Sequence, residues 1–102
     1  MLKITNDMEE ISKDNNAIVY FSAEWCGPCK QVKPQFAKAA VIDKDTSYYV
    51  VDVDKMDSAW MNKLNIKSIP QIFKMNSGEI DRVTKGRTSQ DILVELGASI
   101  ET

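Results

Sequence analysis

Ala17-Ile-Val-Tyr-Phe-Ser-Ala-Glu-Trp-Cys-Gly-Pro-Cys-Lys30 is the stretch of sequence that decides the fold. Its first seven residues are almost all apolar or aromatic, and two of them are β-branched. Such a run predicts a fully buried strand. Turn residues and then a helical pattern follow it. Both cysteines of the chain, Cys26 and Cys29, lie at this junction between strand and helix.

The spacing of the two cysteines favours a disulfide that opens and closes reversibly. Residues three apart on a helix have Cβ atoms roughly 5–6 Å apart, and a disulfide needs about 3.5–4.5 Å, so a small adjustment closes the bond. At the helix start, unsatisfied backbone N–H groups and the helix dipole favour the thiolate of Cys26. We therefore expect Cys26 to attack a substrate disulfide and Cys29 to resolve the mixed disulfide. Pro28 suits an early helix position, and Gly27 leaves room for a substrate backbone.

Three other interpretations of the cysteine pair compete with redox chemistry. A purely structural disulfide would stabilise the folded chain by only about 2 kcal/mol, because the loop that it closes is so short. A zinc site is disfavoured because the chain has no histidine and no third cysteine, so the usual Cys/His tetrahedral set cannot be completed within it. The third alternative is two reduced cysteines without a role. We prefer redox chemistry and predict no metal site.

The motif Trp25-Cys26-Gly27-Pro28-Cys29 resembles the active-site motif of the thioredoxin family letter for letter. The resemblance extends over nearly the whole chain, with Pro34, Ile69-Pro70, Phe73-Lys74, Gly78 and Gly86 as further landmarks. It implies an α/β protein with the thioredoxin fold, in which about four helices flank a central mixed sheet of four to five strands. The length of 102 residues suits one domain over the whole chain, residues 1–102.

The composition of the chain limits which binding partners and which cellular compartment we expect for it. The net charge is −2, from 13 basic and 15 acidic residues, so no dominant basic surface indicates nucleic acid. No apolar run approaches the ~20 residues needed to cross a bilayer, and the first ten residues lack the apolar core of a signal peptide. Since both cysteines belong to the reactive motif, we expect a reducing compartment. The interpretation is a cytoplasmic monomer without nucleic-acid or membrane partners.

Periodicity and turn residues predict the remaining elements. A helix between the strands at 17–23 and 47–54 favours a right-handed crossover and a parallel strand pair. Asn6 with Glu9 suggests a capping pair for a first helix over 7–13, and Pro34 should kink the helix that runs from the motif to about Ile42. Further strands are expected at 2–4, 71–75 and 80–83, and further helices from Asp57 or Ser58 to Leu64 and from Thr88 or Ser89 onward. The predicted helical core positions are Met8, Ile11, Cys29, Val32, Phe36, Ala39, Ala40, Met61, Leu64, Ile66, Ile92, Leu93, Leu96 and Ile100.

The resemblance also implies a substrate groove. In the family, the proline that matches Pro70 is cis and packs beside the cysteines, which leaves the backbone of Ile69 available to pair with an extended substrate segment. The groove residues implied in this way are Trp25, Gly27, Pro28, Ile69, Pro70 and Gly86. Lys85 and Arg87 flank Gly86 and predict a modest bias toward acidic partners.

Tyr20 departs from the family pattern. Many thioredoxins carry a buried aspartate at this position, behind the second cysteine, where it is thought to help move a proton. A phenol with a pKa of about 10 cannot accept that proton at pH 7 in the same way. Either Cys29 loses its proton through water, or Asp52 on the neighbouring strand is a substitute base. We hypothesise a hydrogen bond between Tyr20 and Asp52.

The leading functional interpretation is a general protein-disulfide reductase. The sequence holds no nucleotide or flavin motif, so no cofactor is expected to be bound and the electrons should come from an external thioredoxin reductase, an NADPH-dependent flavoprotein. An oxidant or isomerase is the second interpretation, although Gly27-Pro28 and Ile69 match reductants better. The third is a thioredoxin-fold subunit or binding partner of a larger assembly whose thiols are dispensable.

Overall fold

Strands and helices alternate along residues 2–96, the part of the chain that the computed structural model describes. This α/β order confirms the fold class expected from the sequence. In chain order the elements are β1 (Leu2–Ile4), α1 (Met8–Ser12), β2 (Ala17–Ser22), α2 (Gly27–Ile42), β3 (Ser47–Asp52), α3 (Ser58–Lys63), β4 (Gln71–Asn76), β5 (Glu79–Thr84) and α4 (Ser89–Leu96).

The strands form one five-stranded mixed sheet in the order β1-β3-β2-β4-β5. β2 lies at its centre, parallel to β3 and antiparallel to β4. β1 and β3 are also parallel, and β4 and β5 form an antiparallel hairpin. Since α2 connects β2 and β3 and these strands are parallel, the predicted parallel strand pair is confirmed.

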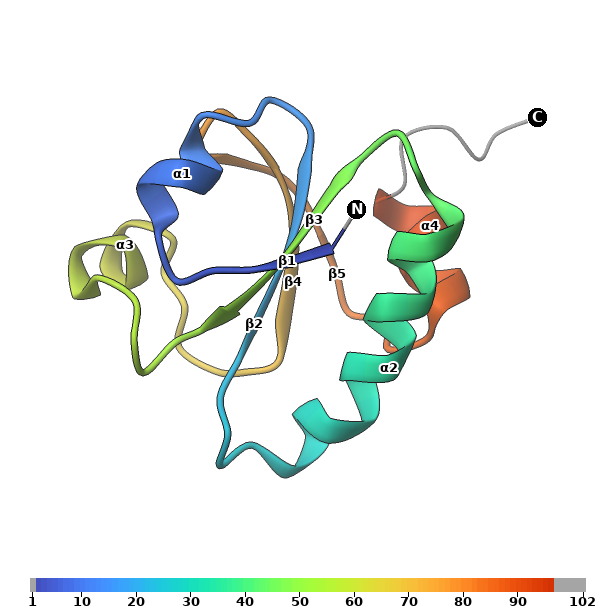
Figure 1. Ribbon diagram of the computed structural model, residues 1–102. Helices are drawn as coiled ribbons and strands as arrows, with labels where there is room; N and C mark the ends of the chain where they lie inside the picture. Colours follow the sequence, from blue (N-terminus) through green and yellow to red (C-terminus); the bar gives the residue numbers. More distant parts are fainter. Residues whose placement is uncertain (1, 97–102) are drawn as a thin grey trace.

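Helices cover both faces of the sheet. Figure 1 shows α1 and α3 on one side and α2 and α4 on the other, with the strands between them. Successive side chains of β2 point to opposite faces: Ile18 and Tyr20 join the core beneath α2 and α4, whereas Val19 and Phe21 join the core on the other face. Burial on both faces explains why this strand is an almost continuous apolar run.

The tip of the β4–β5 hairpin needs a left-handed backbone. Ser77 and Gly78 have φ angles of 52° and 88°, the pattern of a two-residue turn that matches the twist of the flanking strands. A Cβ at Gly78 would lie 3.1 Å from the Cβ of Ser12. The turn predicted at 76–79 is therefore confirmed, and it packs closely against the end of α1.

Two predicted details are wrong. Asp7, not Asn6, caps α1, because its carboxylate accepts hydrogen bonds from the backbone N–H groups of Glu9 and Glu10 at 3.0 and 3.3 Å. Asn6 instead accepts a hydrogen bond of 2.9 Å from the backbone N–H of Asp52. β3 ends at Asp52 and not at Asp54, since the Asp52 carboxylate accepts from the N–H of Asp54 and turns the chain.

The predicted helical core is confirmed for most of its members. Met61 is only partly buried at the edge of the core near α1 and α3, and Ile100 lies outside the described residues. Pro34 lies inside α2 as expected. The residues confirmed as buried are Met8, Ile11, Cys29, Val32, Phe36, Ala39, Ala40, Leu64, Ile66, Ile92, Leu93 and Leu96.

Candidate active site

Cys26 and Cys29 are joined in a disulfide at the first turn of α2. Their Cα atoms are 5.3 Å apart. Cys26 is the N-cap residue of the helix, and its sulfur accepts a hydrogen bond of 3.2 Å from the backbone N–H of Cys29. An N–H group that already faces this sulfur would also stabilise a thiolate there after reduction. Each cysteine is 4% exposed in the disulfide form.

Trp25 precedes the disulfide and is 69% exposed. Its indole N–H donates a hydrogen bond of 2.7 Å to the carboxylate of Asp54, just beyond the end of β3. Trp25 and Asp54 border a hollow of about 210 Å³ that Ile69 also lines. Asp54 is a site residue that the sequence analysis missed. Its 29-residue separation from Trp25 left no local signal for the contact.

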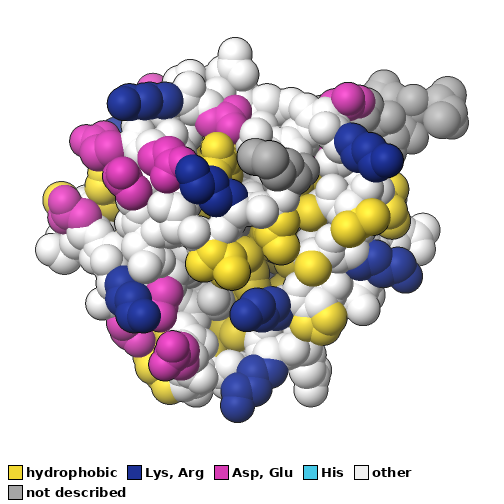
Figure 2. All heavy atoms as spheres, in the orientation of Figure 1, with side chains coloured by type: hydrophobic (Ala, Val, Ile, Leu, Met, Phe, Trp, Pro, Cys, Tyr) yellow, Lys and Arg dark blue, Asp and Glu magenta, His cyan; other side chains and the backbone are white. Residues whose placement is uncertain are grey.

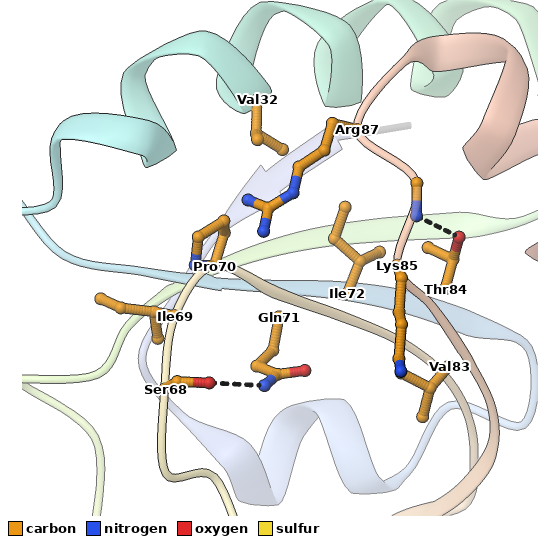
Figure 3. Close-up of a pocket in the computed structure, with 11 residues that line it drawn as sticks. Val32, Ser68, Ile69, Pro70, Gln71, Ile72, Val83, Thr84, Lys85 and Arg87 are labelled. Carbon is orange, nitrogen blue, oxygen red and sulfur yellow. Dashed lines mark hydrogen bonds between the residues drawn. The ribbon is translucent and has the colours of Figure 1, made fainter.

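The peptide bond between Ile69 and Pro70 is cis, as the resemblance implies. Ile69, Pro70 and Gly86 line a second hollow of about 250 Å³, together with Val32 and Arg87 (Figure 3). The chain segment before β4 and the loop between β5 and α4 thus meet beside α2.

A third hollow adjoins the second along α2. Pro28 lines it, and Val32 and Arg87 border both. Five of the six implied groove residues border these three hollows: Trp25, Pro28, Ile69, Pro70 and Gly86. Gly27 lies exposed on the disulfide turn and lines none of the three.

Tyr20 lies on the buried side of the disulfide. Its hydroxyl donates a hydrogen bond of 2.7 Å to the carbonyl oxygen of Cys29. The hypothesised hydrogen bond from Tyr20 to Asp52 is therefore wrong, because the single hydroxyl hydrogen is already engaged. Burial raises the pKa of Tyr20 to about 12, although a hydrogen bond with Ser22 and the charge of Arg87 act in the opposite direction. Tyr20 is accordingly neutral at pH 7 and holds the backbone of Cys29.

Asp52 and Cys29 open into the same hollow, which has a volume of about 410 Å³. Ile4, Lys33 and Lys55 also line it. Figure 2 shows the face of the molecule that carries β1: apolar side chains gather at its centre and acidic ones gather over α1. The carboxyl groups that line this hollow beside Cys29 are those of Asp52 and Glu24.

Residues 2–96 contain neither a candidate metal site nor a candidate membrane-spanning helix. No group of three or more His, Cys, Asp or Glu side chains in this range could hold a metal ion. None of the helices described there is long and apolar enough to cross a membrane.

The family model that matches this chain and two proteins similar to it in sequence carry the name thioredoxin. The family model described as Thioredoxin matches residues 2–98. A thioredoxin of Mycoplasmoides gallisepticum is 33% identical over 99 residues, which cover 94% of this chain and 98% of that protein. Thioredoxin H8 of Arabidopsis thaliana is 38% identical over 74 residues, but this chain spans only about half of its length, 49%.

The structural comparison agrees with the sequence comparison. The solution structure of oxidised thioredoxin from Plasmodium falciparum superposes with a TM-score of 0.75 at 29% sequence identity, covering 90% of this chain and 91% of that one. That structure is of an oxidised thioredoxin, and in this chain Cys26 and Cys29 are joined in a disulfide. The chain belongs to the thioredoxin family of thiol–disulfide oxidoreductases.

Proposed function

We propose that this protein reduces disulfides in other proteins by dithiol–disulfide exchange. The thiolate of Cys26 attacks a substrate disulfide, forms a mixed disulfide and releases one substrate thiolate. The thiolate of Cys29 then attacks the sulfur of Cys26, releases the second substrate thiolate and closes the Cys26–Cys29 disulfide. Two electrons pass to the substrate in each cycle. The observation that carries the proposal is the disulfide at the N-terminus of α2, with the Cys26 sulfur facing a backbone N–H.

The hollows beside the disulfide support binding of an extended substrate segment. We assign substrate contacts to the exposed Trp25, to Gly27 and Pro28 on the disulfide turn, and to Ile69, Pro70 and Gly86. Since Pro70 has no N–H, the backbone of Ile69 is left to pair with the substrate in the manner of an added strand. Such backbone contacts suit many sequences, as a general reductase requires.

The dithiol must be regenerated from outside. The pair stores two electrons, and the sequence carries no nucleotide or flavin motif. We therefore assign regeneration to a thioredoxin reductase, an NADPH-dependent flavoprotein. The proposal includes one domain acting as a monomer in the cytoplasm, where the dithiol would remain reduced.

We assign Asp52 as the acceptor of the Cys29 proton, directly or through water, because both residues line one hollow. Asp52→Asn should then slow the resolution of a preformed mixed disulfide and shift the pH profile of that step, with Cys26 alkylation unchanged. The matched control is Asp81→Asn, which removes the same charge from an exposed position on β5. An unchanged pH profile of resolution in Asp52→Asn would exclude Asp52 as the base.

The central test is reduction of insulin disulfides with NADPH and a thioredoxin reductase. The wild-type protein should consume NADPH continuously only when insulin is present. Cys26→Ser should abolish turnover, and Cys29→Ser should accumulate a mixed disulfide at Cys26. Failure of the wild type to reduce insulin with either the enzyme or dithiothreitol as electron source would refute the proposal. The reduction potential of the pair, measured against glutathione, separates a reductant from an oxidant.

A further inference from the structure

The hollow beside Pro70 is positively charged, in contrast to the chain as a whole. Its lining includes Lys85 and Arg87 but no carboxylate side chain, and apolar residues such as Val32 and Ile72 form much of the rest. Arg87 also borders the adjoining hollow at Pro28, where it is the single charged lining residue. The net charge of the chain is −2. The cationic character is therefore local to this part of the site.

Arg87 and Lys85 point in different directions. In Figure 3 the Arg87 side chain reaches from the loop between β5 and α4 across the hollow, and its guanidinium lies toward Pro70 and Val32. The Lys85 side chain extends the other way, along Val83. Arg87 is thus the cation that faces the cis proline.

The loop that carries Arg87 is fixed by hydrogen bonds to Asp91. The Asp91 carboxylate accepts from the backbone N–H groups of Arg87 and Thr88, both at 3.3 Å, and the Thr88 hydroxyl accepts from the N–H of Asp91 at 3.1 Å. A Cβ at Gly86 would lie 2.2 Å from the Cβ of Asp91, which shows how closely the loop packs on α4. The backbone of Arg87 is therefore positioned before any substrate arrives.

The guanidinium of Arg87 is left free to bind. Within residues 2–96 the structure has one ion pair, between Lys3 and Glu10, and no hydrogen bond from the Arg87 side chain. A guanidinium is a planar fork of N–H donors that matches a carboxylate. A guanidinium that is exposed and has no ion-pair or hydrogen-bond partner among the described residues can serve as a recognition group beside the substrate groove.

We propose that Arg87 selects substrate segments in which an aspartate or glutamate lies close in sequence to the reacting cysteine. The inference rests on the proposed disulfide-reductase function and adds the substrate class. The carboxylate would pair with the Arg87 guanidinium while the substrate backbone lies along Ile69-Pro70.

Three end-blocked peptides test the preference. Each is a symmetrical disulfide dimer with one cysteine per strand, flanked on both sides by Asp, Asn or Lys. Reduced protein should cleave the Asp peptide about two- to fivefold faster than the Asn peptide at low salt, the range for one exposed ion pair. The advantage should vanish as the Debye length falls from about 30 Å at 0.01 M to about 3 Å at 1 M salt.

Arg87→Glu should reverse the order, so that the Lys peptide reacts faster than the Asp peptide. The control Lys44→Glu changes the net charge equally at an exposed position between α2 and β3, at the far end of α2 from the disulfide, and should keep the wild-type order. The rate with the Asn peptide measures any general effect of Arg87 on the thiols. An unchanged order in Arg87→Glu, or an equal slowing of all three peptides, would overturn the proposal.

A binding measurement separates this proposal from the proposed function. The Cys26→Ser/Cys29→Ser protein, with or without Arg87→Glu, is titrated with the same peptides, and binding is followed by NMR chemical shifts. An Arg87-dependent preference for Asp in the double-serine protein, together with a wild-type protein that reduces none of the peptides, would support charge selection and refute the reductase function. Reduction of all three peptides by the wild-type protein without any charge preference would support the reductase function and refute charge selection by Arg87.

Discussion

The hydroxyl of Tyr20 donates a hydrogen bond to the backbone carbonyl of Cys29, so this side chain connects the core to the disulfide turn. Its ring also packs on Phe36, with the ring centroids 5.2 Å apart. Tyr20 is thus a neutral group that holds Cys29 in place.

Tyr20→Phe should lower the free energy of unfolding by about 0.5–1.5 kcal/mol. The ring contact with Phe36 is kept, and only the hydrogen bond to the Cys29 carbonyl is lost. Urea denaturation of the oxidised proteins measures the difference. Tyr49→Phe, which removes a partly buried hydrogen bond to Asp14 on the other side of the sheet, is the matched control for stability, and only Tyr20→Phe should also change the rate of mixed-disulfide resolution.

Alkaline pH should destabilise the fold through its buried tyrosines. Burial raises the pKa of Tyr20 to about 12, and burial together with the Asp43 carboxylate raises the pKa of Tyr48. Below pH 10 both phenols are protonated in the folded and unfolded chains. Between pH 10 and pH 12 the unfolded chain ionises first, so the free energy of unfolding falls as pH rises. Urea titrations across this window should show a shallower decline for Tyr20→Phe, and an identical slope would contradict the raised pKa.

Residue-level predictions succeeded where the signal was local. Cys26 and Cys29 are three positions apart, and their disulfide follows from helix geometry. The partner of Trp25 is Asp54, and the partner of the Asp52 backbone is Asn6, 46 residues away. Contacts of this kind depend on how the strands pair, which no short stretch of sequence specifies.

At the scale of elements, the loop between β5 and α4 is the part of the site with the least room for substitution. Gly86 packs against the first turn of α4, and its N–H donates to the Thr84 hydroxyl at 3.0 Å. This loop carries Arg87 and borders Pro70, so a change in its packing affects the substrate groove directly.

Gly86→Ala should destabilise the protein by about 1–3 kcal/mol, as overpacking does elsewhere. The added methyl would overlap the Cβ of Asp91, which cannot rotate away. Gly27→Ala is the matched control, because a Cβ there meets no atom within 4 Å. Thermal unfolding of both variants measures the contrast, and equal melting temperatures would show that the loop moves at little cost.

Periodicity predicted the helices and strands well because each element buries a regular stripe or face. Apolar spacing identified the buried side of α2 and of α4 through Leu96. It could not distinguish Asp7 from Asn6 as the cap of α1, since both side chains are suitable caps. A tertiary contact determines which residue is the cap, because the Asn6 side chain accepts a hydrogen bond from the backbone of Asp52 in β3.

At the scale of the whole molecule, the disulfide lies at the border of one core and adds a short covalent loop to it. Both cysteines belong to the apolar cluster beneath α2 and α4. That cluster contains many side chains from other elements, so we expect the fold to persist without the bond. The oxidised and reduced proteins should accordingly share one structure.

Oxidation should raise the free energy of unfolding by about 2 kcal/mol, the loop-entropy value for so short a loop. Denaturant titrations with and without dithiothreitol measure this difference, and far-UV circular dichroism should be the same in both states. Cys26→Ser/Cys29→Ser should match the reduced protein. Loss of secondary structure on reduction would mean that the bond is a structural requirement and not a redox device.

The central position of β2 affects how the protein fluctuates. Its backbone is hydrogen-bonded along both edges and its side chains are covered on both faces. Amide hydrogens in such a strand reach solvent only when the whole sheet opens, so they should be the last in the chain to exchange with deuterium. The sulfur chemistry begins four residues after β2 ends, at Cys26. Cys26 is attached close to this slowly exchanging strand, so it can form and break disulfide bonds repeatedly while the sheet that positions it stays folded.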